Sequence, residues 1–122
     1  IGENPRLSFF DVTKKDKGSI IIKRNGFKYK QIGAMLKDKL MESFIVDAPY
    51  DVKLLNQPVA VSTHQGQELT FILEGSLKVQ IENHTVILNE GDSVVFDTEY
   101  PHGMIAVSEN GCRFLAVMTN SI

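Results

Sequence analysis

The chain has 122 residues, of which 43% are hydrophobic and 23% are charged, and its formal net charge at pH 7 is -2. This length suits one globular domain rather than two, and the net charge argues against a domain that binds nucleic acid as a whole. No apolar run approaches the roughly 20 residues that a membrane helix needs, and no stretch resembles a secretory signal. We therefore expect one globular domain without membrane contact.

The charges are distributed unevenly along the chain. Residues 1–52 carry ten Lys and Arg against seven Asp and Glu, whereas residues 53–122 carry three against eight. The basic cluster that begins at Lys14 is typical of a solvated hairpin face. A position of this basic front near DNA or an acidic partner is the alternative.

The single cysteine, Cys112, has no second cysteine with which to form an internal disulfide. Its neighbours Arg113 and Phe114 continue into an apolar run, which favours a buried strand thiol over a reactive one. A reducing cytoplasm is the compartment we expect. The chain starts at Ile1 rather than Met, which indicates a piece excised from a larger protein.

The first half of the chain is predicted to form an arm followed by strands. Residues 1–18 contain glycine and proline and are expected to be an arm or linker rather than part of the barrel. Residues 19–23 are β-branched, and the Asn25-Gly26 dipeptide that follows suits the positive φ angles of a tight hairpin turn. Further strands are expected over 27–36 and 41–46.

One stretch of this region allows a second interpretation, and the stretch after it is expected to be a loop. Residues 34–44 also suit a helix, although the β-rich flanks and the short length favour strands. Residues 47–61 contain Pro49 and Pro58 and are expected to form a loop that leads into a strand at 59–61.

Short strands and turns recur through the second half of the chain. His84 falls in a predicted turn over residues 82–84 and is expected to be exposed to solvent. Turn residues every eight to twelve positions favour an all-β sandwich or barrel over residues 19–122. The predicted strands are 69–74, 77–81, 85–88, 94–96, 103–107 and 113–119.

Two of the three histidines join a glutamate in this strand-rich region. Glu68 follows His64 by four positions, and His102 lies beyond the next turns, directly after Pro101. Two imidazoles and one carboxylate can hold iron, manganese, nickel or zinc and leave positions open for water or a ligand. The spacing alone is equally compatible with a loop histidine and a histidine that caps a strand.

Strand alternation predicts which residues share the face of these candidates. If Glu68 points inward, Thr70 and Ile72 do too, while Leu69, Phe71 and Leu73 face a packed sheet or a partner subunit. Met104 would share the face of His102 in the same way. The residues that we expect to line the ligand site are Ser62, Thr70, Ile72, Phe96 and Met104.

The motifs around these residues resemble those of the cupin family. His64, three intervening residues, Glu68, six further residues and Gly75 match the end of the first cupin motif, and Gly91 and His102 match the second. The resemblance covers about residues 59–119. It implies the cupin double-stranded β-helix, a jelly-roll barrel, with His64, Glu68 and His102 in the positions of metal ligands.

Several positions depart from the family pattern. Ser62 occupies the place of the first histidine ligand, Asp97 and Glu99 replace a proline and a glycine, and Ala106 replaces the final asparagine. Serine is a poor ligand for a divalent ion, so the departure implies a weaker site with three of the four family ligands.

Within the family, the runs from His64 to Leu77 and from Leu88 to Asp97 resemble the C-terminal sensor domains of bacterial regulators with a Cro/repressor-type helix-turn-helix. Residues 4–10 would then connect to the DNA-binding domain, and DNA would be contacted only through that domain. The resemblance implies a small-molecule effector in the barrel, a homodimer and no catalytic residues.

Two other functions compete with this interpretation. A small metal-dependent oxygenase or isomerase would use the same three residues to hold a catalytic ion. A structural barrel would contain them as a satisfied buried network. The sequence does not identify the metal or the effector.

Overall fold

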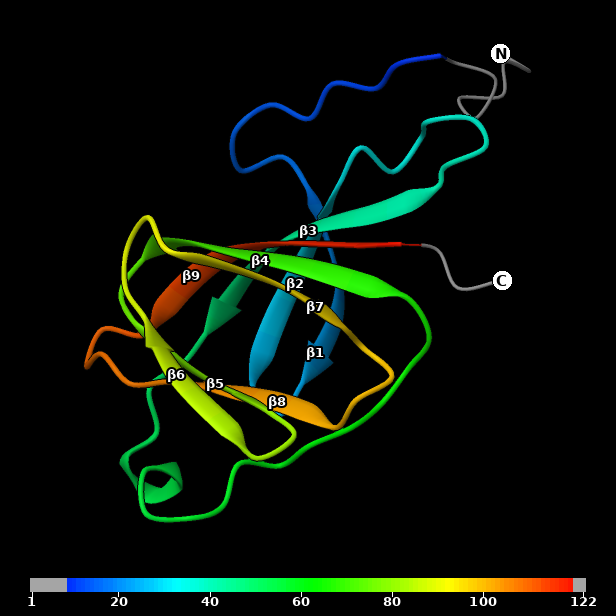
Figure 1. Ribbon diagram of the computed structural model, residues 1–122. Coiled ribbons are helices and arrows are strands. Elements are labelled where there is room, and N and C mark those ends of the chain that lie inside the picture. The colour runs from blue at the N-terminus through cyan, green and yellow to red at the C-terminus, as the bar shows by residue number, and fades with distance from the viewer. Residues whose placement is uncertain (1–8, 120–122) are drawn as a thin grey trace.

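The chain folds into two antiparallel sheets that face each other (Figure 1). The structure, a computed structural model, describes residues 9–119, and the side chains of residues 21–24 lie outside that description. The larger sheet has the strand order β1-β2-β3-β9-β4-β7, and the smaller one has the order β6-β5-β8. The strands are β1 (Ser19–Arg24), β2 (Phe27–Ile32), β3 (Met41–Ala48), β4 (Gln67–Glu74), β5 (Leu77–Ile81), β6 (His84–Leu88), β7 (Ser93–Asp97), β8 (His102–Ala106) and β9 (Cys112–Thr119).

The all-β prediction is confirmed, and most strand positions agree with it. The helical alternative for residues 34–44 is wrong, because Met41–Ala48 pairs along its whole length with β9. The predicted strand 27–36 ends early at Ile32, since Gly33 turns the chain with a φ of 64°. His84 is exposed as predicted, but it begins β6 rather than lying in the turn.

The segment between β3 and β4 differs most from the prediction. Residues 59–61 do not form a strand, and pairing starts only at Ser62, which forms an isolated bridge to His102. A short 3-10 helix, η2 (Val52–Leu54), was not predicted. Its N-cap Asp51 accepts a hydrogen bond from the Lys53 amide at 3.0 Å, which satisfies a free N–H at the start of the turn.

The core lies between the two sheets and is apolar along most of its length. Cross-strand pairing arranges the inner face of the large sheet in rows. The outermost row contains Phe96, Glu68, Met118 and Glu42, so it carries two carboxylates. The deeper rows are built mainly from buried apolar side chains, including Phe44, Val46, Ala48, Ile72, Phe114 and Ala116.

The opposite end of the sheets closes around glycine turns. Gly75 and Gly111 both have a φ near 83°, at 82° and 83°, a conformation that glycine adopts without strain. A Cβ on Gly111 would lie 2.7 Å from the carbonyl oxygen of Ala48, so the backbone there leaves no room for a side chain. These contacts hold the β8–β9 turn against the end of β3.

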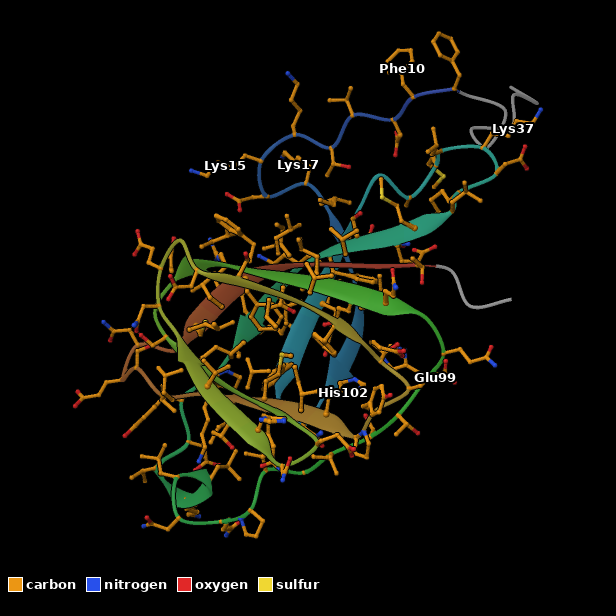
Figure 2. All side chains as sticks on the ribbon, in the orientation of Figure 1. Phe10, Lys15, Lys17, Lys37, Glu99 and His102 are labelled. Carbon is orange, nitrogen blue, oxygen red and sulfur yellow. The ribbon has the colours of Figure 1, made fainter. Side chains whose placement is uncertain are left out.

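Residues 9–18 of the predicted arm lie beyond the end of the barrel, where Figure 2 shows Phe10, Lys15 and Lys17. The Thr13 hydroxyl accepts a hydrogen bond from the Gly33 amide, and Asp11 Oδ2 accepts one from the Met35 amide, both at 3.0 Å. These bonds attach the arm to the loop that connects β2 with β3. Residues 1–8 of the predicted arm are outside the described part of the chain.

No helix within residues 9–119 has both the length and the apolar character that a membrane crossing requires.

Candidate metal centre

Glu68 stands on the inner face near the start of β4, where only 7% of its surface is exposed. The Thr70 hydroxyl, two residues along the same face, donates a hydrogen bond to Glu68 Oε2 at 3.2 Å. Burial raises the pKa of Glu68, because the charged carboxylate loses hydration, while Thr70 and the two nearby histidines act in the opposite direction. The site therefore contains a desolvated carboxylate whose charge a cation would stabilise.

His102 begins β8 (Figure 2). It is also 7% exposed. Its Nδ1 lies 2.8 Å from the Tyr100 carbonyl oxygen, and a carbonyl can only accept. The neutral imidazole therefore carries its proton on Nδ1, and Nε2 keeps a free lone pair for a metal. Such backbone contacts are the usual way in which a metal-binding histidine is oriented.

His64 approaches from the exposed segment before β4. Its backbone amide donates to the Thr98 carbonyl at 2.9 Å, which fixes the segment beside the β7–β8 connection. Its Nε2 lies 4.0 Å from Glu68 Oε1, and its ring centroid lies 5.1 Å from that of His102. Because its Nδ1 is 3.3 Å from the Gln65 carbonyl, a proton there leaves Nε2 facing the carboxylate.

The three predicted metal ligands thus come together at one point. One ligand atom from each of His64, Glu68 and His102 lies within 4.8 Å of the other two. A metal with ligands at about 2.1 Å spans ligand pairs up to about 4.2 Å apart, so small side-chain adjustments close the site. Two neutral imidazoles and one carboxylate fit iron, manganese, nickel or zinc and leave coordination positions open.

Ser62 lies beside His102 at the edge of the site. It exchanges two backbone hydrogen bonds with His102, at 2.9 and 3.0 Å, so the two side chains point to the same side of the strand pair. Ser62 is exposed. Its hydroxyl is a weak ligand, so this side of the site is accessible to water or to a ligand atom.

The structure places the other predicted ligand-lining residues at different depths. Phe96 is buried beside the site, with its ring centroid 5.0 Å from that of His102. Thr70 is fully buried and bonded to Glu68, Ile72 is fully buried one row deeper, and Met104 packs against the core. Their contact with a ligand stays a prediction.

Sequence reasoning missed a second polar group at this end of the barrel. Glu42 pairs with Met118, which in turn pairs with Glu68, so both carboxylates lie in one row of the inner face. Lys39 Nζ lies 3.0 Å from Glu42, and Gln31 Nε2 donates to Glu42 Oε2 at 2.6 Å. Only the strand register brings Glu42 into this row.

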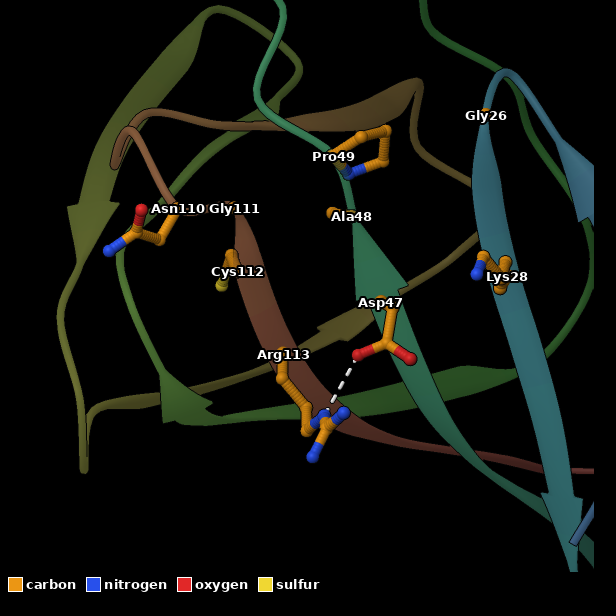
Figure 3. A pocket seen from close by; sticks show the side chains of 9 residues that line it. All are labelled: Gly26, Lys28, Asp47, Ala48, Pro49, Asn110, Gly111, Cys112 and Arg113. Atoms are coloured by element: carbon orange, nitrogen blue, oxygen red, sulfur yellow. Dashed lines mark hydrogen bonds and ion pairs between the residues drawn. The ribbon is translucent and has the colours of Figure 1, made fainter. Parts of the chain in front are cut away.

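A cavity of about 200 Å³ lies elsewhere, between the β1–β2 and β8–β9 turns (Figure 3). It is lined by Lys28, Asp47, Cys112 and Arg113 among others. Arg113 pairs with Glu74, six residues along β4 from Glu68, which corresponds to about 20 Å at the rise of a strand. This cavity is therefore separate from the metal centre.

A family model described as Cupin domain matches residues 57–118, which is 62 of the 122 residues. No curated protein matches the chain.

Solved structures with the same fold include an enzyme, an RmlC-like cupin and a regulator. Hydroxypropylphosphonic acid epoxidase from S. wedmorenis, in complex with fosfomycin, has a TM-score of 0.71 at 19% identity over 89% of this chain and 58% of its own. An RmlC-like cupin from Shewanella frigidimarina has a TM-score of 0.72 at 14% identity and covers 93% of this chain and 96% of its own. An HTH_3 family transcriptional regulator from Vibrio cholerae has a TM-score of 0.60 at 22% identity, over 79% and 52%.

These identities show the fold alone. This chain spans about three fifths of the length of the epoxidase chains that it matches, at 58–59%. The two facing antiparallel sheets are those of a jelly-roll barrel.

Proposed function

Because this chain belongs to the cupin domain family, we propose that it is the effector-sensing domain of a bacterial transcriptional regulator. In this proposal a divalent metal binds to His64, Glu68 and His102, and a small-molecule effector binds beside it. DNA is contacted only through a helix-turn-helix domain outside this chain.

One observation carries the metal part of the proposal. The three ligand atoms converge within 4.8 Å on a carboxylate that is buried without a fixed positive charge in contact. A bound divalent cation would supply that charge and would polarise an oxygen atom of a ligand in the open position. Phe96 and the apolar rows behind it would select the shape of the effector.

The regulator part of the proposal is supported by the fold and by the length of a neighbour. The Vibrio cholerae structure is named as a transcriptional regulator, and this chain covers 52% of it. A helix-turn-helix coding sequence directly upstream of Ile1 in the full gene is the expected finding. A start codon immediately before Ile1 would contradict this part alone.

Metal binding is tested by thermal unfolding of chelator-treated protein with Mn(II), Fe(II), Ni(II) or Zn(II). A ligand at 100 times its Kd stabilises the folded state by about 2.7 kcal/mol, which raises the Tm measurably. The wild type should respond to at least one ion, and His64→Ala should not. His84→Ala is the matched control, because His84 is exposed on β6 and outside the cluster.

If no ion shifts the wild type, or if His64→Ala responds as strongly as His84→Ala, the metal centre is refuted.

A metal-dependent enzyme is the second candidate, favoured by a set of only three protein ligands, which would leave coordination positions open for a substrate. The epoxidase described above (HppE), a neighbour of this fold, was crystallised with Fe(II). Oxygen uptake by the Fe(II)-loaded protein with candidate acids separates the two functions. Turnover that depends on His64 would support the enzyme, whereas ligand binding without turnover would support the sensor.

A further inference from the structure

The cavity between the β1–β2 and β8–β9 turns is named here the turn cavity. Two of its lining residues, Gly26 and Gly111, are turn glycines with a φ of 83°, and their missing side chains keep the rim open. A Cβ on Gly26 would lie 3.2 Å from Pro49 Cγ, and one on Gly111 would lie 2.7 Å from the Ala48 carbonyl oxygen. Pro49 and Ala48 line the same cavity, so a side chain at either glycine would occupy part of it.

Cross-strand pairing places charged side chains of three neighbouring strands along one wall of the turn cavity. Lys28 on β2 and Arg113 on β9 are the pairing partners of Asp47 on β3, one on each side. Figure 3 shows the Lys28 and Arg113 side chains on opposite sides of Asp47. The lining residues therefore include two cations and one carboxylate, and the wall carries a net positive charge.

The negative charge of Asp47 is balanced without Lys28. Arg113 Nε donates to Asp47 Oδ1 at 2.8 Å, and Lys30 Nζ lies 3.6 Å from Asp47 Oδ2, so each carboxylate oxygen has a cation nearby. Lys28 enters no ion pair within the residues that the structure describes. The surplus positive charge at the turn cavity is therefore the ammonium of Lys28.

Three lining side chains also keep unused hydrogen-bond donors. Arg113 donates through Nε alone, because its Nη1 is 3.9 Å from Glu74, which is too long for a hydrogen bond. Over residues 9–119, neither Lys28 Nζ nor the Asn110 amide takes part in a hydrogen bond. An ammonium and a guanidinium contain donors and no acceptors, so the ligand that complements them is a negatively charged acceptor.

We propose that the turn cavity binds a small oxyanion, a carboxylate or a phosphate group, between Lys28 and the Nη atoms of Arg113. Asn110 supplies a further donor, and Asp47 orients the guanidinium. The volume of about 200 Å³ is below the roughly 300–1,000 Å³ of pockets for drug-sized ligands, so the occupant is a small acid rather than a large cofactor. This site goes beyond the proposed function, since it uses no residue of the metal centre.

Inorganic phosphate and acetate are the probes, added to chelator-treated protein with sodium chloride holding the ionic strength constant. The backbone amides of Gly26 and Gly111 should shift saturably in amide correlation NMR spectra. Lys28→Met removes the charge and keeps an apolar stem, and it should weaken binding at least about 10-fold, because hydrogen bonds to charged groups are the stronger kind. Lys78→Met is the matched control, since Lys78 lies on β5 in the smaller sheet and outside the cavity.

Arg113→Lys provides a second variant, which keeps the charge but loses the planar fork, and it should also weaken binding. Far-UV circular dichroism with thermal unfolding confirms that each variant is folded. Gly26 and Gly111 amides that do not respond, or that respond as strongly to chloride alone, would overturn the proposal. So would equal affinities in Lys28→Met and Lys78→Met.

The position of the shifts separates this site from the metal centre. Shifts confined to Gly66, two residues after His64, would place the anion beside the histidines and would also overturn the proposal. The metal titration of His64→Ala depends on none of these results, so the oxyanion site and the metal centre can fail independently.

Discussion

Strand β4 carries one glutamate near each end, and the two side chains differ in burial and in their charged neighbours. Glu68 points inward, is buried, and has two imidazoles within reach of its carboxylate. The side chain of Glu74 is 70% exposed and lies 3.9 Å from Arg113. Glu74 lies at the end of the barrel that contains the Gly111 turn, called the far end here, and its carboxylate therefore has a permanent counter-charge and abundant water. Glu68 lies at the end that contains the candidate metal centre, called the mouth here, and its carboxylate has neither.

This difference indicates where the barrel needs a ligand. At the far end, Asp47 and Arg113 form a pair at 2.8 Å that satisfies both charges without any addition. At the mouth, the polar groups within residues 9–119 that interact with the Glu68 carboxylate are a hydroxyl donor and two histidines whose free nitrogens are acceptors when neutral. A divalent cation would satisfy all three ligands at once, so we expect the mouth to be a metal-binding site and the Asp47–Arg113 pair of the far end to be a structural closure.

The largest expected effect is on metal affinity. Glu68→Ala should lower the affinity for the preferred divalent ion by more than about 100-fold, since the loss of an outer-shell partner alone costs about 10- to 100-fold. Glu74→Ala should leave the affinity unchanged. Isothermal titration with chelator-treated protein measures both, and equal losses in the two variants would contradict the distinction between the two ends.

The second effect concerns the backbone of the far end. Gly111→Ala combines a left-handed φ of 83° with a Cβ 2.7 Å from a carbonyl oxygen. It should destabilise the fold by about 3 kcal/mol or more. Gly91→Ala is the matched control, because Gly91 has a φ of 89° but nothing within 4 Å of its Cβ position, and should cost about 1 kcal/mol.

Urea unfolding gives both free energies. Equal losses in the two glycine variants would show that the close approach to Ala48 does not constrain the end of the barrel.

Much of the fold follows from local sequence signals. Period-2 patterns and the Asn25-Gly26 turn predict strands at nearly their observed positions, because each depends on neighbours in the chain. The strand expected at residues 59–61 fails for the opposite reason. Apolar residues there can pair only where the fold provides a partner, and that partner, His102, lies opposite Ser62.

The candidate site shows the same limit. His64, Glu68 and His102 are found from the sequence because their spacing matches a family motif. The hydrogen bonds that orient them come from Thr70 and from the Tyr100 carbonyl, and a backbone acceptor leaves no sequence signal. Glu42 enters the same row only through the pairing of β3 with β9, a long-range contact that no local pattern encodes.

A smaller effect is expected for the other buried ionisable group, Cys112 at the far end. Burial raises the pKa of its thiol from 9.0 to about 11, so it should remain protonated and react slowly with iodoacetamide at pH values below that. Since the folded pKa lies above the unfolded one, its contribution to stability is complete below pH 9.0 and is lost as the pH rises through about 11.

Cys112→Ala should therefore lose less stability than the wild type between these pH values in urea unfolding. Rapid alkylation of the folded wild type at neutral pH would show that the thiol is accessible and that the far end opens.

The smallest effect is expected for the Asp47–Arg113 pair. Its side chains are 29% and 36% exposed, so water screens the charges, and a double-mutant cycle with Asp47→Ala and Arg113→Ala should give a coupling energy below about 1 kcal/mol. Added salt should reduce the coupling further. A coupling above about 2 kcal/mol that resists salt would mean that the pair is desolvated. The charged groups at the far end would then be desolvated like the carboxylate at the mouth. The two ends of the barrel would no longer differ in the way that Glu68 and Glu74 indicate.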